Sequence, residues 1–290
     1  MEIAIGNVRP ARQRRSYVAW RSRHGLLFVP VLLLLVPLFL FPTVFLLSKS
    51  VTDGVGGLGN FRKAASSELV RVVLLRSFGV AAVVSLLSLL VGLPFAAVVK
   101  MSGPRMRVFL LGAVSASLFT SVIVRAYAWL ALLGRNGPVE KMLSSVGINV
   151  EKFPLVHSRF GVLVGMVQYG IPFMVLAIFD VMNRLDPVLD KAAATLGAGS
   201  VTRWVKIKLP LLAPGIAAGI TIVFVTTLGY FVIPSVLGSP RELMIGQLIA
   251  QQVGKTLNWG YAAALATILL AVTLVLVLLF RRLSAAVAKY

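Results

Sequence analysis

The stretch Phe78–Val99, FGVAAVVSLLSLLVGLPFAAVV, decides the fold of this chain because it is almost entirely apolar and carries no charged residue. An α-helix rises 1.5 Å per residue, so about 20 such residues cross the ~30 Å hydrocarbon core of a bilayer. The run ends at Lys100, where the chain becomes basic. The stretch therefore predicts a membrane-spanning helix.

Five further runs of the same kind flank this one. They are continuously apolar rather than alternating between apolar and polar residues, which favours helices over the strands of a membrane barrel. The sequence therefore predicts an all-α polytopic membrane protein with six transmembrane helices. The other five runs are Leu26–Leu47, Val108–Leu133, Phe160–Met182, Leu212–Leu237 and Trp259–Phe280.

Proline and glycine interrupt several of these runs. Neighbouring helices can satisfy the carbonyls that such residues free, and kinks of this type often lie beside a transport path. For any single proline, close helix packing is the favoured explanation. The interrupting residues are Pro30, Pro37, Pro42, Gly92, Pro94, Gly170, Pro172, Gly229 and Pro234.

The overall composition agrees with a lipid environment. Hydrophobic residues make up 58% and charged residues 13%, against roughly 45–50% and 25% in soluble domains. The chain has no cysteine and only two histidines, which argues against disulfides and against thiolate or histidine metal sites. The net charge of +20 is distributed between the apolar runs, so it does not indicate a nucleic-acid partner.

The distribution of Lys and Arg predicts the orientation. Basic residues are more frequent before the first run, in the second-to-third and fourth-to-fifth connections and in the tail than in the alternate connections. The positive-inside rule therefore places both termini in the cytoplasm of a bacterial cell. We expect a basic N-terminal segment 1–25 without a cleavable signal, a membrane domain 26–283 with a cytoplasmic loop 183–211, and a tail 284–290. Residues Arg9 to Arg23 serve as a topology signal or bind anionic lipid.

The sequence offers no catalytic constellation. Gly254-Lys255-Thr256 resembles the end of a phosphate-binding loop, but Ile249 occupies the position where that loop requires glycine. Ser, His and Asp are too sparse for a nucleophilic triad, and Asp180 is the one acid inside a predicted span. We therefore expect no bond chemistry and no cofactor bound by this chain itself.

The fourth-to-fifth connection predicts a compact cytoplasmic helix. Asp186 suits the N-cap, Pro187 the first helical position and Gly197 a left-handed end. Ser200 is expected to cap a second short helix through Trp204. The first helix carries the small residues Ala192 to Ala194, across which another backbone can approach closely. From the residues alone, this helix either docks a partner or rests on the lipid surface.

The same loop resembles the cytoplasmic "EAA" motif of ABC importer permeases. Ala192, Ala193, Gly197, Ile207, Leu209 and Pro210 match the motif at its spacing, whereas Lys191 replaces its glutamate. Asp190 or an acid on the partner is expected to compensate for that reversal. The resemblance implies an ATPase-coupling surface made of Asp190, Lys191, Ala192, Ala193, Ala194, Gly197, Ala198, Ile207, Leu209 and Pro210.

The resemblance extends from about Leu26 to the end and is most specific to spermidine/putrescine-type permeases. It implies a type I ABC importer permease fold in the inner membrane. It also implies a second permease subunit, an extracytoplasmic solute-binding protein, and cytoplasmic ATPases that hold ATP and Mg. The stretches that carry it are Val124–Trp129, Leu133–Gly137, Leu228–Pro234, Leu237-Gly238 and Asn258–Gly260.

Candidate residues of the solute pathway are chosen because a polar group is costly in lipid or because an aromatic ring attracts a cation. Arg125 is expensive in a span and should face the bundle or a watery cavity, and aromatic faces suit a cationic amine, although Tyr and Trp also serve as interfacial belt residues. A polyamine is the expected solute, with another small amine or an aminophosphonate as the alternative. A non-transporting scaffold or receptor and an intramembrane enzyme are the rival classes. The candidate pathway residues are Arg125, Tyr127, Trp129, Tyr169, Asp180 and Tyr230.

Overall fold

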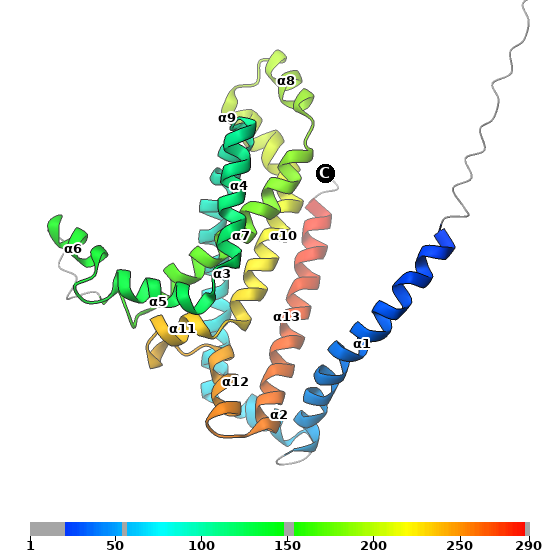
Figure 1. The fold of residues 1–290 in the computed structure, drawn as a ribbon, viewed down its shortest axis with the longest axis vertical. Coiled ribbons are helices and arrows are strands. Elements are labelled where there is room, and N and C mark those ends of the chain that lie inside the picture. Colours follow the sequence, from blue (N-terminus) through cyan, green and yellow to red (C-terminus); the bar gives the residue numbers. More distant parts are fainter. Residues whose placement is uncertain (1–20, 54–56, 148–153, 288–290) are drawn as a thin grey trace, which may run out of the picture. The chain divides into compact units, whose positions relative to one another are not determined.

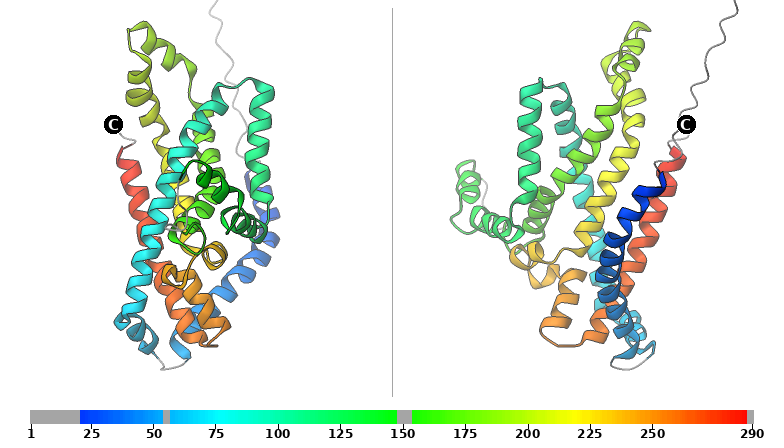
Figure 2. Two further views of the ribbon diagram at one scale, coloured as in Figure 1. Left: turned by 90° about the vertical axis from the view of Figure 1, so that its left-hand side faces the viewer. Right: turned by 45° about the vertical axis from the view of Figure 1, so that its right-hand side comes forward.

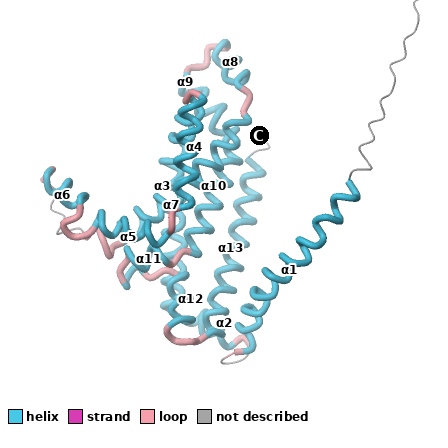
Figure 3. The backbone as a smooth tube through the Cα atoms, in the orientation of Figure 1, coloured by secondary structure: helices cyan, strands magenta, loops and turns pink. Residues whose placement is uncertain are grey.

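The computed structural model describes residues 21–53, 57–147 and 154–287. Most of the predicted N-terminal segment 1–25, and residues 288–290 of the predicted tail, lie outside them. Within the described residues every regular element is a helix (Figure 3). The elements are α1 Arg21–Thr52, α2 Gly59–Ser66, α3 Glu68–Met101, α4 Pro104–Phe119, α5 Val122–Leu133, α6 Pro138–Ser145, α7 Arg159–Arg184, α8 Pro187–Thr195, α9 Ser200–Arg203, the π-helical turn η2 Trp204–Lys208, α10 Leu209–Gly229, α11 Val232–Leu237, the 3₁₀ turn η3 Pro240–Glu242, α12 Ile245–Gly254 and α13 Trp259–Val287 (Figure 1).

The chain forms two parts, residues 1–48 and 49–290. The described residues of the first part belong to α1, which continues through Pro30, Pro37 and Pro42. Its apolar side chains from Val31 to Leu46 are exposed in this chain. A helix that is apolar on every side is stable in lipid or against a neighbouring protein. This finding agrees with the first predicted span.

Three long helices, α3, α7 and α10, form the centre of the second part and pack against one another (Figure 2). Val84, Met174, Ile178 and Leu212 are fully buried where they meet. Small residues bring the backbones together, as is usual between membrane helices. A Cβ on Gly170 of α7 would lie 2.6 Å from Ser88 Oγ of α3 and 2.9 Å from a methyl of Val223 on α10.

This close approach gives a stability prediction. We expect Gly170→Val to lower the thermal unfolding temperature of the detergent-solubilised chain, because overpacking three facing helices costs roughly 1–3 kcal/mol. Gly79→Val in α3 is the matched control, since a Cβ at Gly79 meets nothing within 4 Å. Equal unfolding temperatures for the two variants would show that α7 does not approach α3 and α10 this closely.

The third predicted span is not one helix, which corrects the prediction of Val108–Leu133. The helix Pro104–Phe119 and the helical segment Val122–Ser145 are bent by 99° to each other. Thr120 and Ser121, at the bend, have extended backbone. The physical reason is Arg125, whose guanidinium Nη2 donates to the carbonyls of Ser117 and Thr120. The arginine thereby satisfies groups at the end of α4 that a continuous helix would have bonded.

The fifth predicted span, Leu212–Leu237, is corrected in the same way. Helix α10 ends at Gly229, Tyr230 is extended, and α11 begins at Val232. In a continuous helix the ring of Pro234 would clash with the carbonyl of Tyr230, four residues earlier. The helix therefore stops before the proline, and α11 packs instead against α5.

The described helices include five that are long and apolar enough to cross a membrane, or six if α4 and the segment after it count as one broken span. The prediction of an all-α polytopic membrane fold is confirmed. Figure 2 shows α8, the α3–α4 connection and the last turns of α13 toward one end of the second part, with α2 and α12 at the other. We refer to these as the α8 end and the α12 end.

Candidate functional site

The loop that carries α8 is built from two local caps that the sequence predicts. The Asp186 carboxylate accepts the Val188 amide at 2.9 Å and begins the helix. At the other end Ala198 N donates to Ala193 O and Gly197 N to Ala194 O, both at 3.0 Å. With Gly197 at φ +83°, this is the Schellman pattern of a left-handed helix end.

The second helix of the loop differs from the prediction. Gly199 occupies the N-cap, and no side chain caps the helix. The Ser200 hydroxyl instead accepts from Arg203 Nη2 at 3.3 Å. The helix does not end at Trp204 but continues through the π-turn η2 into α10. Pro210 explains the turn, because it has no amide to donate to Lys206 and its ring requires a wider helix there.

Asp190 ties α8 to the helix that follows it. One carboxylate oxygen lies 3.2 Å from Arg203 Nη1 and the other 3.2 Å from Lys208 Nζ. Lys208 also lies over the Trp204 ring, 5.4 Å from its centroid. The Asp190 carboxylate is therefore engaged within the chain. Sequence reasoning missed Arg203 and Lys208, because contacts between α8 and α9–η2 depend on tertiary structure rather than on local pattern.

Most of the outer surface of this loop is apolar. Leu196 is 88% exposed and Val201 77% exposed. Ala192 and Ala194 are exposed as well, whereas Ala193 is buried against the chain. Exposed apolar side chains grouped on a capped helix are typical of a protein interface. We call the exposed surface of residues 187–201 the docking surface.

The second candidate site gathers three of the six predicted pathway residues around the two helix breaks. Arg125 of α5 is 6% exposed and lies over Tyr169 of α7, with its guanidinium carbon 5.4 Å from the ring centroid. Tyr169 and Tyr230 have ring centroids 4.5 Å apart. Arg125 Nη1 is buried and has no hydrogen-bond partner in the part of the chain that the structure describes. We call these three residues the arginine–tyrosine cluster.

The other three predicted pathway residues lie elsewhere. Tyr127 is 57% exposed. Trp129 is half-buried and packs against the central core. The Asp180 carboxylate accepts from Arg184 Nη2 at 2.9 and 3.0 Å, and this ion pair is exposed at the end of α7. The structure therefore brings together the arginine and two aromatic rings, and it leaves the acid outside this cluster.

Relatives of known function resemble the chain over most of its length. The spermidine/putrescine transport system permease protein PotB of Haemophilus influenzae is 29% identical over 210 residues, which cover 72% of this chain and 73% of that protein. PotB of Escherichia coli K12 is 29% identical over 212 residues, covering 73% and 77%. The inner membrane ABC transporter permease protein YdcU of Escherichia coli K12 is 29% identical and covers 91% of each chain.

Solved structures support the fold. A chain of the bacterial alginate ABC transporter, in complex with an alginate pentasaccharide-bound periplasmic protein, superposes with a TM-score of 0.70 at 19% identity and covers 92% of this chain and 96% of that one. A chain of the inward-facing MetNI methionine ABC transporter gives 0.53 at 18% identity, covering 77% and 98%.

The family assignment follows from the match to a family model over residues 26–289. That match includes α8 with its preceding cap, both helix breaks and the arginine–tyrosine cluster. It confirms the resemblance that the sequence carries. The chain belongs to the family of binding-protein-dependent transport system inner membrane components.

Proposed function

We propose that this chain is the polyamine-conducting permease subunit of an ATP-driven importer and works with a second permease subunit, identical or paralogous. The observation that carries the coupling role is the docking surface: a capped helix with exposed Leu196, Val201 and alanines, held to the membrane domain through Asp190. A cytoplasmic ATPase covers this surface. ATP and Mg bind to that partner, and this chain supplies no catalytic site.

The α8 end is the cytoplasmic end in this proposal. Its connections carry many basic residues and few acids, as cytoplasmic segments do. Both termini then lie in the cytoplasm of a bacterial cell, and the α12 end receives a solute-binding protein outside. The basic residues at the α8 end include Lys100, Arg105, Arg107, Arg184, Lys191, Arg203, Lys206 and Lys208.

The polyamine assignment rests on the named relatives and on aromatic rings at the helix breaks. Tyr169 and Tyr230 offer π-faces, which attract ammonium groups when water is excluded. Asp180 is paired with Arg184 and stands outside the cluster. With so little acid in the pathway, discrimination between solutes falls mainly to the binding protein.

Another small amine or an aminophosphonate is the second candidate solute, and a specific observation favours the aminophosphonate. Arg125 Nη1 is buried and unpartnered among the described residues. A buried donor without a partner is costly, and an anionic group on the solute would satisfy it. A polyamine carries no anionic group.

The test is solute-stimulated ATP hydrolysis and uptake by the complete complex in proteoliposomes. We expect binding protein loaded with spermidine or putrescine to stimulate both activities, and unloaded binding protein to stimulate neither. If only an aminophosphonate stimulated the two activities, the assignment of a polyamine as the solute would be wrong, and the assignment of an importer would be retained. An assembled complex that hydrolyses ATP but takes up none of these solutes would favour a non-transporting scaffold.

A further inference from the structure

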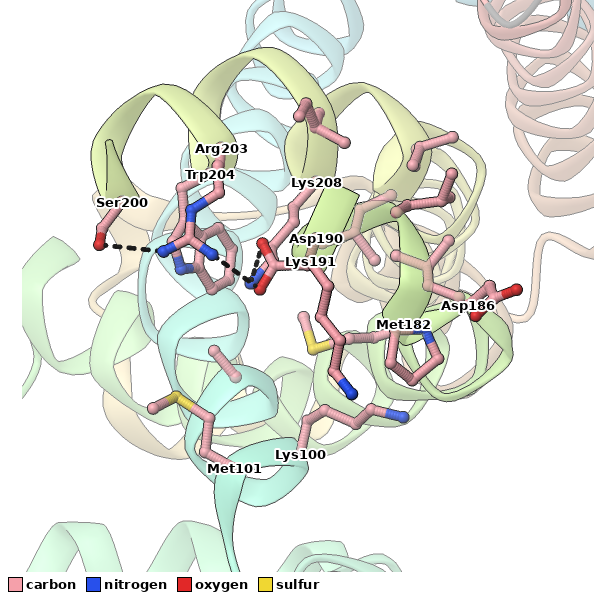
Figure 4. Close-up of a pocket in the computed structure, with 17 residues that line it drawn as sticks. Lys100, Met101, Met182, Asp186, Asp190, Lys191, Ser200, Arg203, Trp204 and Lys208 are labelled. Atoms are coloured by element: carbon pink, nitrogen blue, oxygen red, sulfur yellow. Dashed lines mark hydrogen bonds and ion pairs between the residues drawn. The ribbon is translucent and has the colours of Figure 1, made fainter. Parts of the chain in front are cut away.

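A cavity of about 540 Å³ lies beneath α8, where the ends of α3 and α7 meet the start of α10 (Figure 4). Most of its wall is apolar and includes Met101, Leu185, Leu189 and Leu211. Four cationic side chains also line it: Lys100, Lys191, Arg203 and Lys208. The cavity thus has a mostly apolar wall and a cluster of positively charged side chains.

The two acids that line the cavity, Asp186 and Asp190, balance only two of its four positive charges. Asp190 is shared between Arg203 and Lys208, and Asp186 accepts the amide that begins α8. Arg203 Nε and Asp190 Oδ1 are both buried and have no hydrogen-bond partner among the described residues. The cavity therefore carries excess positive charge.

Two of the four cations have no acidic partner among the residues that the structure describes. Lys100 Nζ donates only to neutral groups of Asn183, its side-chain oxygen at 3.2 Å and its carbonyl at 3.4 Å. Lys191 makes no ion pair with any acid that the structure describes. Figure 4 shows both lysine side chains extending into the same cavity. Two like charges beside an apolar wall repel each other unless an anion lies between them.

The cavity's place in the fold indicates what kind of anion fits. It begins at the ends of α3 and α7, two of the helices that are long and apolar enough to cross a membrane, and phospholipid headgroups are expected beyond the hydrocarbon core at this end of the fold. Met101, Leu189 and Leu211 line it and are also exposed, at 83%, 47% and 40%, so its oily wall continues onto the surface. A free phosphate would leave that wall empty, whereas an amphipathic anion would fill it.

We infer that this cavity binds an anionic phospholipid, with the phosphate between Lys100 and Lys191 and the first part of an acyl chain along Met101 and Leu211. Burial of the chain adds to the electrostatic attraction. The site lies directly under the docking surface, so its occupant supports α8 from the membrane side. The inference does not depend on which solute the chain transports.

Brominated phospholipids give a direct test, because bromine quenches a nearby tryptophan. Trp204 lines the cavity, and the chain has three other tryptophans, Trp20, Trp129 and Trp259, which are replaced by Phe. The full chain is reconstituted in phosphatidylcholine vesicles with increasing dibrominated phosphatidylglycerol, or with dibrominated phosphatidylcholine in its place. No ATPase is present. We expect phosphatidylglycerol to quench Trp204 at a lower mole fraction, with a preference of about fivefold for each lysine.

Variants separate a specific site from general surface charge. Lys100→Gln with Lys191→Gln should abolish the preference, whereas Lys206→Gln should keep it, because Lys206 is exposed on the same loop and does not line the cavity. Equal quenching by the two lipids in the unmodified lysine background would overturn the inference. So would a preference that survives the double substitution, or displacement of the lipid by millimolar inorganic phosphate, which would make this a free-anion site.

Discussion

Gly197→Val is expected to uncouple ATP hydrolysis from solute uptake, by about tenfold or more. Gly197 ends α8 at φ +83°, and a Cβ there meets nothing within 4 Å. Within this chain the cost therefore comes from the backbone, because an L-residue in the left-handed region costs roughly 1–2 kcal/mol, and a β-branched one more. A cost of 1.4 kcal/mol corresponds to a tenfold decrease in the equilibrium constant for closing the helix end. The measurement is uptake per ATP hydrolysed by the reconstituted complex.

The neighbouring glycine provides a matched control. Gly199 has φ −64° and ψ 161°, an extended conformation that valine adopts readily, and its Cβ position is also open. Gly199→Val should therefore retain coupling, as should Gly197→Asn, since asparagine tolerates the left-handed region. Equal loss in both valine variants would show that bulk on this surface matters, rather than the turn.

Cross-linking distinguishes lost docking from lost transmission. The chain has no native cysteine, so a single cysteine at the exposed Ala194 reports contact with the ATPase. We expect this cross-link in the parent chain and a reduced yield in Gly197→Val. If Ala194 gave no cross-link while other contacts to the ATPase formed, the docking surface would be wrongly assigned.

Arg125→Gln is expected to have the largest effect on stability. Arg125 donates to the carbonyls of Ser117 and Thr120 at the end of α4. Glutamine is too short to reach both carbonyls. Because hydrogen bonds to charged groups are worth about 1.5–3 kcal/mol each, the loss should be roughly 3 kcal/mol or more. We expect a lower unfolding temperature for the detergent-solubilised complex and a loss of uptake at temperatures where the parent is active.

The control is Arg135→Gln, an exposed arginine just after the same helix. It should leave the unfolding temperature unchanged. Arg125→Lys should fall between the two, since an ammonium group cannot present the planar donors of a guanidinium. If Arg125→Gln unfolded like the parent but lost uptake, Arg125 would contact solute without holding the break, and the bend between α4 and α5 would need another cause.

The sequence predicted the long helices well, because a span requires only length and apolar composition. Runs such as Phe78–Val99 and Phe160–Met182 lie within α3 and α7. The break at Thr120 and Ser121 has no proline or glycine to mark it and depends on Arg125 reaching back along the chain. Pro234 marks an interruption of the predicted span Leu212–Leu237, but hydropathy alone does not show whether a proline kinks a helix or ends it.

In the candidate sites, too, the features set by local sequence were predictable and the features set by tertiary contacts were not. The caps of α8 at Asp186 and Gly197 are local and were predicted, whereas the Asp190 ion pairs are tertiary and were not. Arg125, which belongs to the arginine–tyrosine cluster, and Tyr127, which does not, are two residues apart on α5, so their side chains leave the helix about 200° apart. One is buried and the other exposed for that reason. The sequence predicts both as pathway residues, Arg125 because a charge in a span is costly and Tyr127 because an aromatic face suits a cationic amine.

The π-turn at Trp204–Lys208 has a mechanical consequence. Because it keeps α9 continuous with α10, Ser200–Gly229 forms one helical segment of 30 residues, about 45 Å long. Such a segment behaves as a lever. One end of the segment, at Ser200, lies within the docking surface. The other end, at Gly229, is followed directly by Tyr230 of the arginine–tyrosine cluster. In the proposed importer, a few ångströms of movement imposed on α8 by the ATPase would reach the aromatic rings without unwinding the helix between them.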